Sequence, residues 1–220
     1  MRITFLGYGN MAKALGGRFK NGHDVVFCGH DAGRAAEAAE SVGVSASKDP
    51  ADAVRGADVV VLATPHDAVF DAIESAGGAD AFAGKTVVDI NNPVPGYAEG
   101  DFTLHRYDDG PSLGEALQHR LPDAVVVKAF NTAEAKVWQL NPIEFDGRKF
   151  MVLVCGNTDQ AKAQVIDLIQ AMGAQAWDVG GIEYAGQLEA VAALTIQCLV
   201  DGHDPLTVFN LIQPEQQPIG

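Results

Sequence analysis

Short apolar runs alternate with segments of helical periodicity along most of the chain. The runs predict buried strands at 3–6, 24–28, 57–63, 85–90, 124–129, 151–155 and 175–179, and a weaker strand near 43–46. The spacing of apolar residues predicts helices at 11–19, 32–42, 67–76, 113–121, 159–172 and 184–200, and a short one from residue 50. This alternation is typical of α/β proteins with a mostly parallel, doubly wound sheet that helices cover on both faces.

The chain of 220 residues is long enough to bury one sizeable core. We expect residues 1–150 to form that core. Residues 151–220 are expected to add a small part, with a C-terminal helical extension, that completes the sheet and a substrate cleft. The longest irregular stretch runs from Pro93 to Pro111, and long loops in compact domains are usually functional or mobile.

A glycine-rich turn separates the first predicted strand from the first predicted helix. It reads Gly7-Tyr8-Gly9-Asn10-Met11-Ala12, the dinucleotide-binding pattern with alanine in its third small position. In such a turn the first glycine permits the tight bend, the second lets the backbone approach a pyrophosphate, and the helix N-terminus attracts the negative charge. The pattern alone is weak, but here it lies between a strand and a helix and precedes a second strand. It therefore predicts a Rossmann-type fold with a dinucleotide site.

The end of the second strand bears on which dinucleotide binds. In NAD-binding proteins an acidic residue there holds the ribose hydroxyls and repels the additional phosphate of NADP. This chain has Gly29 and His30 at that point and Arg34 in the next helix, with no acid at the strand tip. Both basic side chains can face a phosphate or can be solvated surface residues, and Asp31 partly offsets their charge. The balance favours NADP.

The composition of the chain mainly argues against certain binding partners and kinds of site. The formal net charge of −14 opposes binding to nucleic acid or to an anionic membrane surface, because phosphates are repelled. No apolar stretch reaches the roughly 18 residues of a membrane-spanning helix, and the N-terminus shows no signal-peptide pattern. The three cysteines lie in apolar runs without paired spacing, which predicts buried free thiols and a cytoplasmic protein. We expect no metal site, since histidines and cysteines form no cluster of ligand spacing.

Two motifs further along the chain resemble a known family. Residues 85–93 read KTVVDINNP and residues 126–132 read VVKAFNT. With the glycine turn they resemble the deazaflavin (coenzyme F420)-dependent NADP oxidoreductases, and they are also similar to the cytosolic reductase domain of the Steap metalloreductases. The stretch 178–189 fits the same family, so the resemblance covers nearly the whole chain. Pyrroline-carboxylate reductases share a similar glycine turn, but their extended helical dimerisation domain is not found in this sequence.

The resemblance implies that NADP and a deazaflavin exchange a hydride across a cleft between the Rossmann core and the C-terminal part. It also implies a homodimer. In this family a Ser-Arg pair typically follows the second strand, with a basic residue four positions later. Gly29, His30 and Arg34 occupy those places here, so a basic residue is kept although the Ser-Arg pair is not.

Loops at the carboxyl ends of the strands should line the cleft, as in other open α/β sheets. The resemblance implies that residues 64–66 lie beside the dinucleotide and that residues 91–93 and 129–131 approach the nicotinamide. His66 can donate to the cofactor or act as an acid, but a surface histidine at a helix start is an equal interpretation. Asn131 can equally cap the segment that follows it. The expected cofactor-binding residues are Gly7, Tyr8, Gly9, Asn10, Met11, Ala12, Gly29, His30, Arg34, Thr64, Pro65, His66, Asn91, Asn92, Pro93, Ala129, Phe130 and Asn131.

The chemistry expected at this site requires few reactive side chains. Hydride transfer between stacked rings needs alignment and exclusion of water more than an acid or a base. We therefore predict no catalytic side chain; Lys128 is expected to orient a loop, and Asp89 to satisfy backbone groups. The partner is expected to be a small hydride donor or acceptor: a deazaflavin, or alternatively a flavin, an imine or a ferric complex. A non-catalytic NADP sensor is a third hypothesis.

Overall fold

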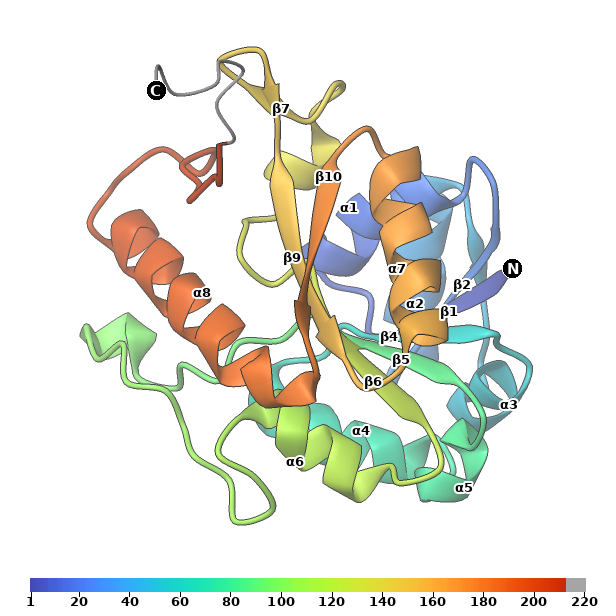
Figure 1. Ribbon diagram of the computed structural model, residues 1–220. Helices are drawn as coiled ribbons and strands as arrows, with labels where there is room; N and C mark the ends of the chain where they lie inside the picture. Colours follow the sequence, from blue (N-terminus) through green and yellow to red (C-terminus); the bar gives the residue numbers. More distant parts are fainter. Residues whose placement is uncertain (213–220) are drawn as a thin grey trace.

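The computed structural model describes residues 1–212, in which one central sheet of eight strands dominates (Figure 1). The strand order is β10-β9-β6-β5-β4-β1-β2-β3. The first six strands are parallel to one another: β1 (Arg2–Leu6), β2 (Asp24–Cys28), β3 (Ser45–Ala46), β4 (Val59–Leu62), β5 (Thr86–Asp89) and β6 (Val125–Lys128). Their order, β3-β2-β1-β4-β5-β6, is that of the Rossmann fold, so the predicted architecture is confirmed.

The last two strands extend the sheet past β6. β9 (Met151–Gly156) pairs antiparallel with β6, and β10 (Gln175–Gly180) pairs parallel with β9. Residues beyond 150 thus add to the same sheet, and the mostly parallel arrangement has one antiparallel junction. A separate short hairpin, β7 (Glu144–Phe145) with β8 (Arg148–Lys149), was not expected from the sequence.

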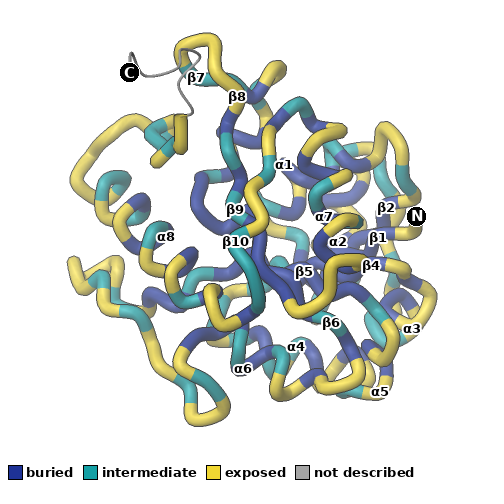
Figure 2. Tube along the Cα trace, viewed as in Figure 1, coloured by how far each residue is buried: buried dark blue, intermediate teal, exposed yellow. Residues whose placement is uncertain are grey.

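Helices cover both faces of the sheet, and Figure 2 shows the buried residues concentrated along the strands. One face packs against α1 (Asn10–Phe19), α2 (Ala32–Val42) and α7 (Asp159–Ala171). The other packs against α3 (Pro50–Arg55), α4 (Val69–Ser75), α5 (Gly78–Phe82) and α6 (Leu113–Arg120). Side chains along β1 point alternately to the two faces of the sheet. Ile3 and Phe5 therefore join the first core, and Leu6 joins the second.

The last helix, α8 (Ala185–Val200), begins against the second core through Ala185 and Leu188 and then runs away from the sheet (Figure 1). Short 3-10 turns connect several elements: His66–Ala68, Tyr97–Glu99, Val137–Gln139 and Ile182–Tyr184. No helix in residues 1–212 combines the length and the apolar character needed to cross a bilayer.

Side-chain caps explain where several helices begin. Asp31, Asp49, Ser112 and Thr158 each accept a backbone N–H in the first turn of α2, α3, α6 and α7. Ser112 and Glu115 form a variant of the capping box, since the Ser112 hydroxyl accepts from the Glu115 N–H and also donates to the Glu115 carboxylate at 2.7 Å.

The expectation of three buried thiols is wrong for one cysteine. Cys28 and Cys155 are buried in strands, but Cys198 is half-buried because α8 has left the sheet where it lies. Helix α5 was also missed, because its five residues are too few to show a helical period.

Candidate dinucleotide-binding site

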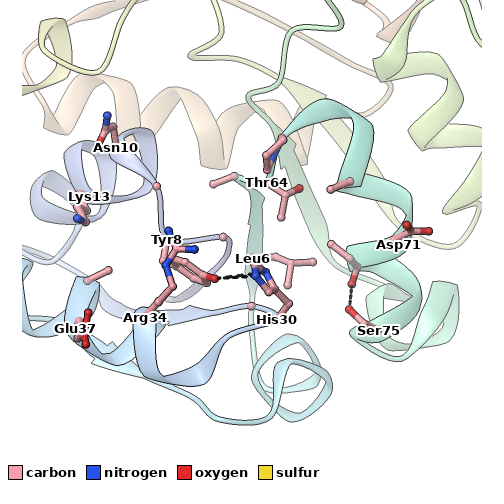
Figure 3. Close-up of a pocket in the computed structure, with 18 of the residues that line it drawn as sticks. Leu6, Tyr8, Asn10, Lys13, His30, Arg34, Glu37, Thr64, Asp71 and Ser75 are labelled. Carbon is pink, nitrogen blue, oxygen red and sulfur yellow. Dashed lines mark hydrogen bonds between the residues drawn. The ribbon is translucent and has the colours of Figure 1, made fainter. Parts of the chain in front are cut away.

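A cleft of about 870 Å³ lies at the carboxyl ends of β1, β2 and β4, where the strand order reverses (Figure 3). Ligands of open α/β sheets bind at such a switch point. One wall comes from the glycine turn and from α1 and α2, and the opposite wall from Thr64 and α4 (Figure 3). Of the residues predicted from the sequence, the cleft is lined by Gly7, Tyr8, Gly9, Asn10, Gly29, His30, Arg34, Thr64 and Pro65.

The two glycines of the turn are required for different structural reasons. Gly7 has φ +124°, and any side chain there would collide with the carbonyl of Ala63 on the neighbouring chain segment. Its N–H donates to the Cys28 carbonyl at 2.8 Å, which ties the turn to β2. Gly9 has φ −74°, which any residue can adopt, and a methyl group there would project into open space. Gly7 is therefore required by folding, whereas Gly9 keeps space free in the cleft.

The start of α1 suits an anionic group. No side chain in residues 1–212 caps this helix, and its first turn carries no acidic residue. Its free N–H groups and the positive end of the helix dipole therefore meet the cleft beside Gly9. On the opposite wall, the Thr64 hydroxyl oxygen is buried with no hydrogen-bond partner in the described part of the chain. These features fit a dinucleotide whose pyrophosphate lies at the glycine turn.

A small cluster of Tyr8, His30 and Arg34 forms one end of the cleft (Figure 3). The Tyr8 hydroxyl lies 3.4 Å from the His30 ring nitrogens, and the Arg34 guanidinium lies 5.6 Å from the centre of the Tyr8 ring. Gly29 makes this possible, because a side chain there would meet the Tyr8 ring. The cluster thus holds two basic groups where a carboxylate would lie in an NAD-binding protein.

Acidic groups near the cluster reduce its positive charge. Asp31 caps α2 by accepting from the Arg34 N–H at 3.0 Å, and this hydrogen bond lowers the pKa of its carboxyl below the ordinary value. Glu37 also lines the cleft, as does Lys13 on the side of α1 (Figure 3). Among the described residues, the two cations that line the cleft, Lys13 and Arg34, are therefore balanced by the carboxylates of Glu37 and Asp71.

A second cavity, which we call the apolar pocket, has about 200 Å³ and meets the cleft at Asn10, a residue that lines both. Its polar lining includes Asn92, Asn131 and Thr195, and α8 supplies one wall. Within residues 1–212 the lining contains no basic side chain, and Glu134 contributes a negative charge. The pocket therefore favours an apolar group that is not anionic. The remaining lining residues are Met11, Ile90, Ala133, Ala135, Ala192, Ile196 and Leu199.

A pair of amides shapes the polar side of the apolar pocket. The Asn92 amide nitrogen donates to the Asn131 carbonyl at 2.7 Å, and the Asn131 amide nitrogen donates to Asn92 Oδ1 at 2.9 Å. Asn131 donates again to the Leu188 carbonyl at 3.1 Å, which fixes the orientation of its amide. Its Oδ1 atom is buried and has no partner among the described residues. Within residues 1–212 this oxygen is therefore an unsatisfied acceptor in a residue that lines the apolar pocket.

The backbone before Asn131 is in an unusual conformation. Phe130 has φ +61° although it is not glycine, and its ring packs between Phe19 and Trp138. Such a conformation costs about 1–3 kcal/mol and persists where packing over-determines it. It turns the chain sharply at the end of β6, immediately before the Asn92–Asn131 pair.

The remaining predicted residues lie near the two cavities without lining the cleft. Met11 lines the apolar pocket, as do Asn92 and Asn131. Ala12, Pro93, Ala129 and Phe130 are buried, and Asn91 is buried in a hydrogen-bond network. His66 lines neither cavity; partial burial lowers its pKa against the opposing charge of Asp67, which favours the neutral ring.

Sequence reasoning missed the helical residues that complete each cavity. In the cleft the missed residues lie on the same helix face as a predicted one: Glu37, Ala38 and Ser41 come three, four and seven residues after Arg34. The spacing was available in the sequence and could have identified them. The α8 wall of the apolar pocket carried no comparable signal, because it depends on how the helix docks.

The fold and the cleft together define a Rossmann-type dinucleotide-binding protein. Residues 2–93 match the family described as NADP oxidoreductase, coenzyme F420-dependent. The F420-dependent NADP reductase of Methanocaldococcus jannaschii is 34% identical over 148 residues, which cover 66% of this chain and 63% of that protein. The metalloreductase STEAP3 of Rattus norvegicus is 30% identical over 191 residues, which cover 86% of this chain and 36% of that protein. The chain thus spans less than two thirds of the length of either relative.

A solved structure extends the similarity to nearly the whole chain. It is a protein of Arthrobacter sp. FB24, provisionally assigned as an F420-dependent NADP reductase. It has a TM-score of 0.83 and 28% identity, covering 96% of this chain and 99% of that one. By these matches the chain is similar to the F420-dependent NADP reductases, as its motifs predicted.

Proposed function

We propose that this protein binds NADP(H) in the cleft and transfers a hydride between it and a deazaflavin-like acceptor. The observation that carries the proposal is the uncapped start of α1 beside Gly9, with space left open above the glycine. NADP bound there would supply the transferable hydride. The remaining work of the chain is to bind, orient and exclude water, and we propose no catalytic side chain.

The cluster at the end of the cleft supports a preference for NADP over NAD. We assign His30 and Arg34 to the additional phosphate of NADP, with Tyr8 holding both groups in place through its ring and hydroxyl. A guanidinium can pair with a phosphate through two parallel hydrogen bonds. We assign the pyrophosphate to residues 7–12, and residues 64–65 to the opposite side of the dinucleotide.

The apolar pocket supports the proposed acceptor class. Because it adjoins the cleft at Asn10, a ring held there would lie next to the nicotinamide end of a dinucleotide in the cleft. The free Asn131 Oδ1 suits an N–H donor, and the lack of a basic side chain among its described lining residues disfavours an anionic ferric chelate. A deazaflavin ring is planar and carries such an N–H group. The Methanocaldococcus jannaschii relative named for F420 supports the same acceptor.

Mixing the protein with NADPH and oxidised coenzyme F420 tests the proposal, with the loss of deazaflavin absorbance as the readout. We expect turnover with NADPH and much less with NADH. Turnover of a flavin, an imine or a ferric complex, but not of F420, would contradict the acceptor assignment. If the protein binds NADPH tightly but reduces none of these compounds, that result would contradict the enzymatic proposal and favour a sensor.

Three further parts of the proposal concern organisation. We propose that residues 1–150 form the NADP-binding core and that the part from residue 151, described as far as residue 212, completes the sheet and the acceptor site; residues 213–220 of the predicted part lie outside the described residues. We also propose a cytoplasmic homodimer, supported by the exposed Leu194 and Val200 on α8. Light scattering of the purified protein tests the dimer, and a monomer mass at micromolar concentration would contradict it.

A further inference from the structure

A fully buried lysine lies between two buried carboxylates near the ends of β5 and β6. Lys128 Nζ lies 2.7 Å from Asp89 Oδ2 and 2.8 Å from Glu189 Oε1, and all three side chains are at most 1% exposed. Asp89 ends β5, Lys128 ends β6, and Glu189 lies in the first turns of α8. We call this group the buried ion network. It joins three elements that are far apart in the sequence.

Further hydrogen bonds complete the network. The Lys128 ammonium donates its third bond to the Asn91 carbonyl at 2.7 Å. Asp89 Oδ1 accepts from the backbone and side-chain nitrogens of Asn91, at 3.0 and 3.1 Å. Glu189 accepts from the Leu113 and Gly114 backbone N–H groups at the start of α6, at 3.3 and 3.2 Å. Each charged group therefore has several partners in a fixed geometry.

The two carboxylates explain how the Lys128 ammonium can be fully buried. Burial alone would lower the pKa of Lys128, but the negative charges of Asp89 and Glu189 and their hydrogen bonds raise it above its ordinary value. Within residues 1–212 no second cation pairs with the second carboxylate, which lies at the positive N-terminal end of α6. Lys128 thus stays charged, and the network depends on α6, α8, β5 and β6 keeping their relative positions.

The network adjoins the residues that form the apolar pocket. Leu188, next to Glu189, accepts from the Asn131 amide through its carbonyl. Further along α8, Thr195 donates to the Thr132 carbonyl at 3.3 Å and lines the pocket. The α8 wall is therefore held against the strand-end loops at two points, about two helical turns apart. Glu189 supplies the charged contact in this series.

We propose that the buried ion network is a positioning device that sets α8 against the Asn92–Asn131 loops and so fixes the width of the acceptor pocket. Lys128, Asp89 and Glu189 are positioning residues, since none of them lines either cavity. This role rests on the proposed function, because the pocket is there assigned to the hydride acceptor. A buried ion pair contributes little net stability compared with apolar residues of similar volume, whereas its directional bonds specify geometry.

Hydrogen–deuterium exchange tests the positioning without any acceptor. In Glu189→Gln and Asp89→Asn, which preserve side-chain size, we expect amides at 186–199 and 130–132 to exchange about tenfold faster or more. Amides at 10–13 and 30–34, beside the cleft, should exchange as in the parent protein. Lys162→Met is the control for loss of a lysine–carboxylate pair outside the network, because it removes the pair with Asp178 at 2.7 Å, whose carboxylate is exposed on the edge strand β10. Unchanged exchange in α8, or equal acceleration in every segment, would overturn the proposal.

Steady-state kinetics with NADPH and oxidised F420 then tests the consequence for the pocket. For Glu189→Gln we expect the KM for F420 to rise about 10- to 100-fold, with the Kd for NADPH changed less than about twofold. Lys162→Met should alter neither value. Equal losses in both values, or none, would contradict the positioning role. If the parent protein does not turn over F420, the proposed function fails, while the exchange experiment still decides whether the network positions α8.

Discussion

The cleft and the apolar pocket meet at Asn10 but are built in opposite ways. The cleft is centred on a turn of consecutive residues, with α2 and α4 completing its walls, and its charged side chains are exposed. The apolar pocket is formed by segments distant in the sequence, and its charged support is fully buried. Local sequence therefore specifies the dinucleotide site, whereas tertiary packing specifies the site proposed for the acceptor. Substitutions should separate the two regions by their effects on stability and on binding.

The largest difference is expected in stability. Lys128→Met leaves two buried carboxylates without their cation and should lower the free energy of unfolding by about 3–5 kcal/mol. Arg34→Ala, at the exposed edge of the cleft, should change it by less than about 1 kcal/mol. Urea denaturation measures both. Similar losses for the two variants would contradict the contrast between a buried and an exposed charged support.

The next difference is in cofactor affinity. Arg34→Ala should weaken NADPH binding about 10- to 100-fold, because a hydrogen bond to a charged group contributes about 1.5–3 kcal/mol. Binding of NADH, which lacks the additional phosphate, should be nearly unchanged, and His30→Ala should have a smaller effect of the same kind. Lys149→Ala, in the β7–β8 hairpin, is the control for loss of a surface cation. If Arg34→Ala and His30→Ala bind NADPH as well as the parent, the phosphate assignment is wrong.

Thiol reactivity gives a smaller effect that distinguishes the two regions. Burial raises the pKa of both Cys28 and Cys155 to about 12. Cys28 ends β2, directly before the cleft residue Gly29, and Cys155 pairs with Lys128 between β9 and β6. At pH 8 iodoacetamide should therefore modify the half-buried Cys198 first. In Glu189→Gln we expect faster modification of Cys155 but not of Cys28. Peptide mass spectrometry measures both, and equal acceleration would show that the network supports the whole fold.

The same pKa shifts predict how stability depends on pH. A thiol whose pKa is raised in the folded protein stays neutral there above pH 9. In the unfolded chain the same thiol has its ordinary pKa of 9.0 and ionises as the pH rises past that value. The two thiols therefore contribute full stability below about pH 9, and the contribution falls as pH rises toward 12. Denaturation of Cys28→Ala between pH 8 and about 10.5 should show a shallower decline than the parent.

The contrast between the regions also explains what the sequence could predict. The strands, most helices and the glycine turn followed from local periodicity and from residues that are close together. Glu189 was not identified as a partner of Lys128, because 61 residues separate them and only the docking of α8 brings them together. The positive φ of Phe130 was not predictable either, since packing against Phe19 and Trp138 imposes it. Cys198 was misjudged because apolar sequence on α8 does not reveal where the helix leaves the sheet.

The central claim is that the turn at Gly9 holds the dinucleotide, and one substitution tests it most directly. Gly9→Ala adds a methyl group to open space in a conformation that alanine adopts, so the protein should fold with nearly unchanged stability. That methyl group would occupy the space proposed for the pyrophosphate, and overpacking of this kind costs about 1–3 kcal/mol. Gly22→Ala, which also adds a methyl group to open space but outside the cleft, is the matched control.

Titration with NADPH, followed by fluorescence, should show affinity about 10- to 100-fold weaker for Gly9→Ala and unchanged for Gly22→Ala. A folded Gly9→Ala protein that binds NADPH as tightly as the parent would contradict the account.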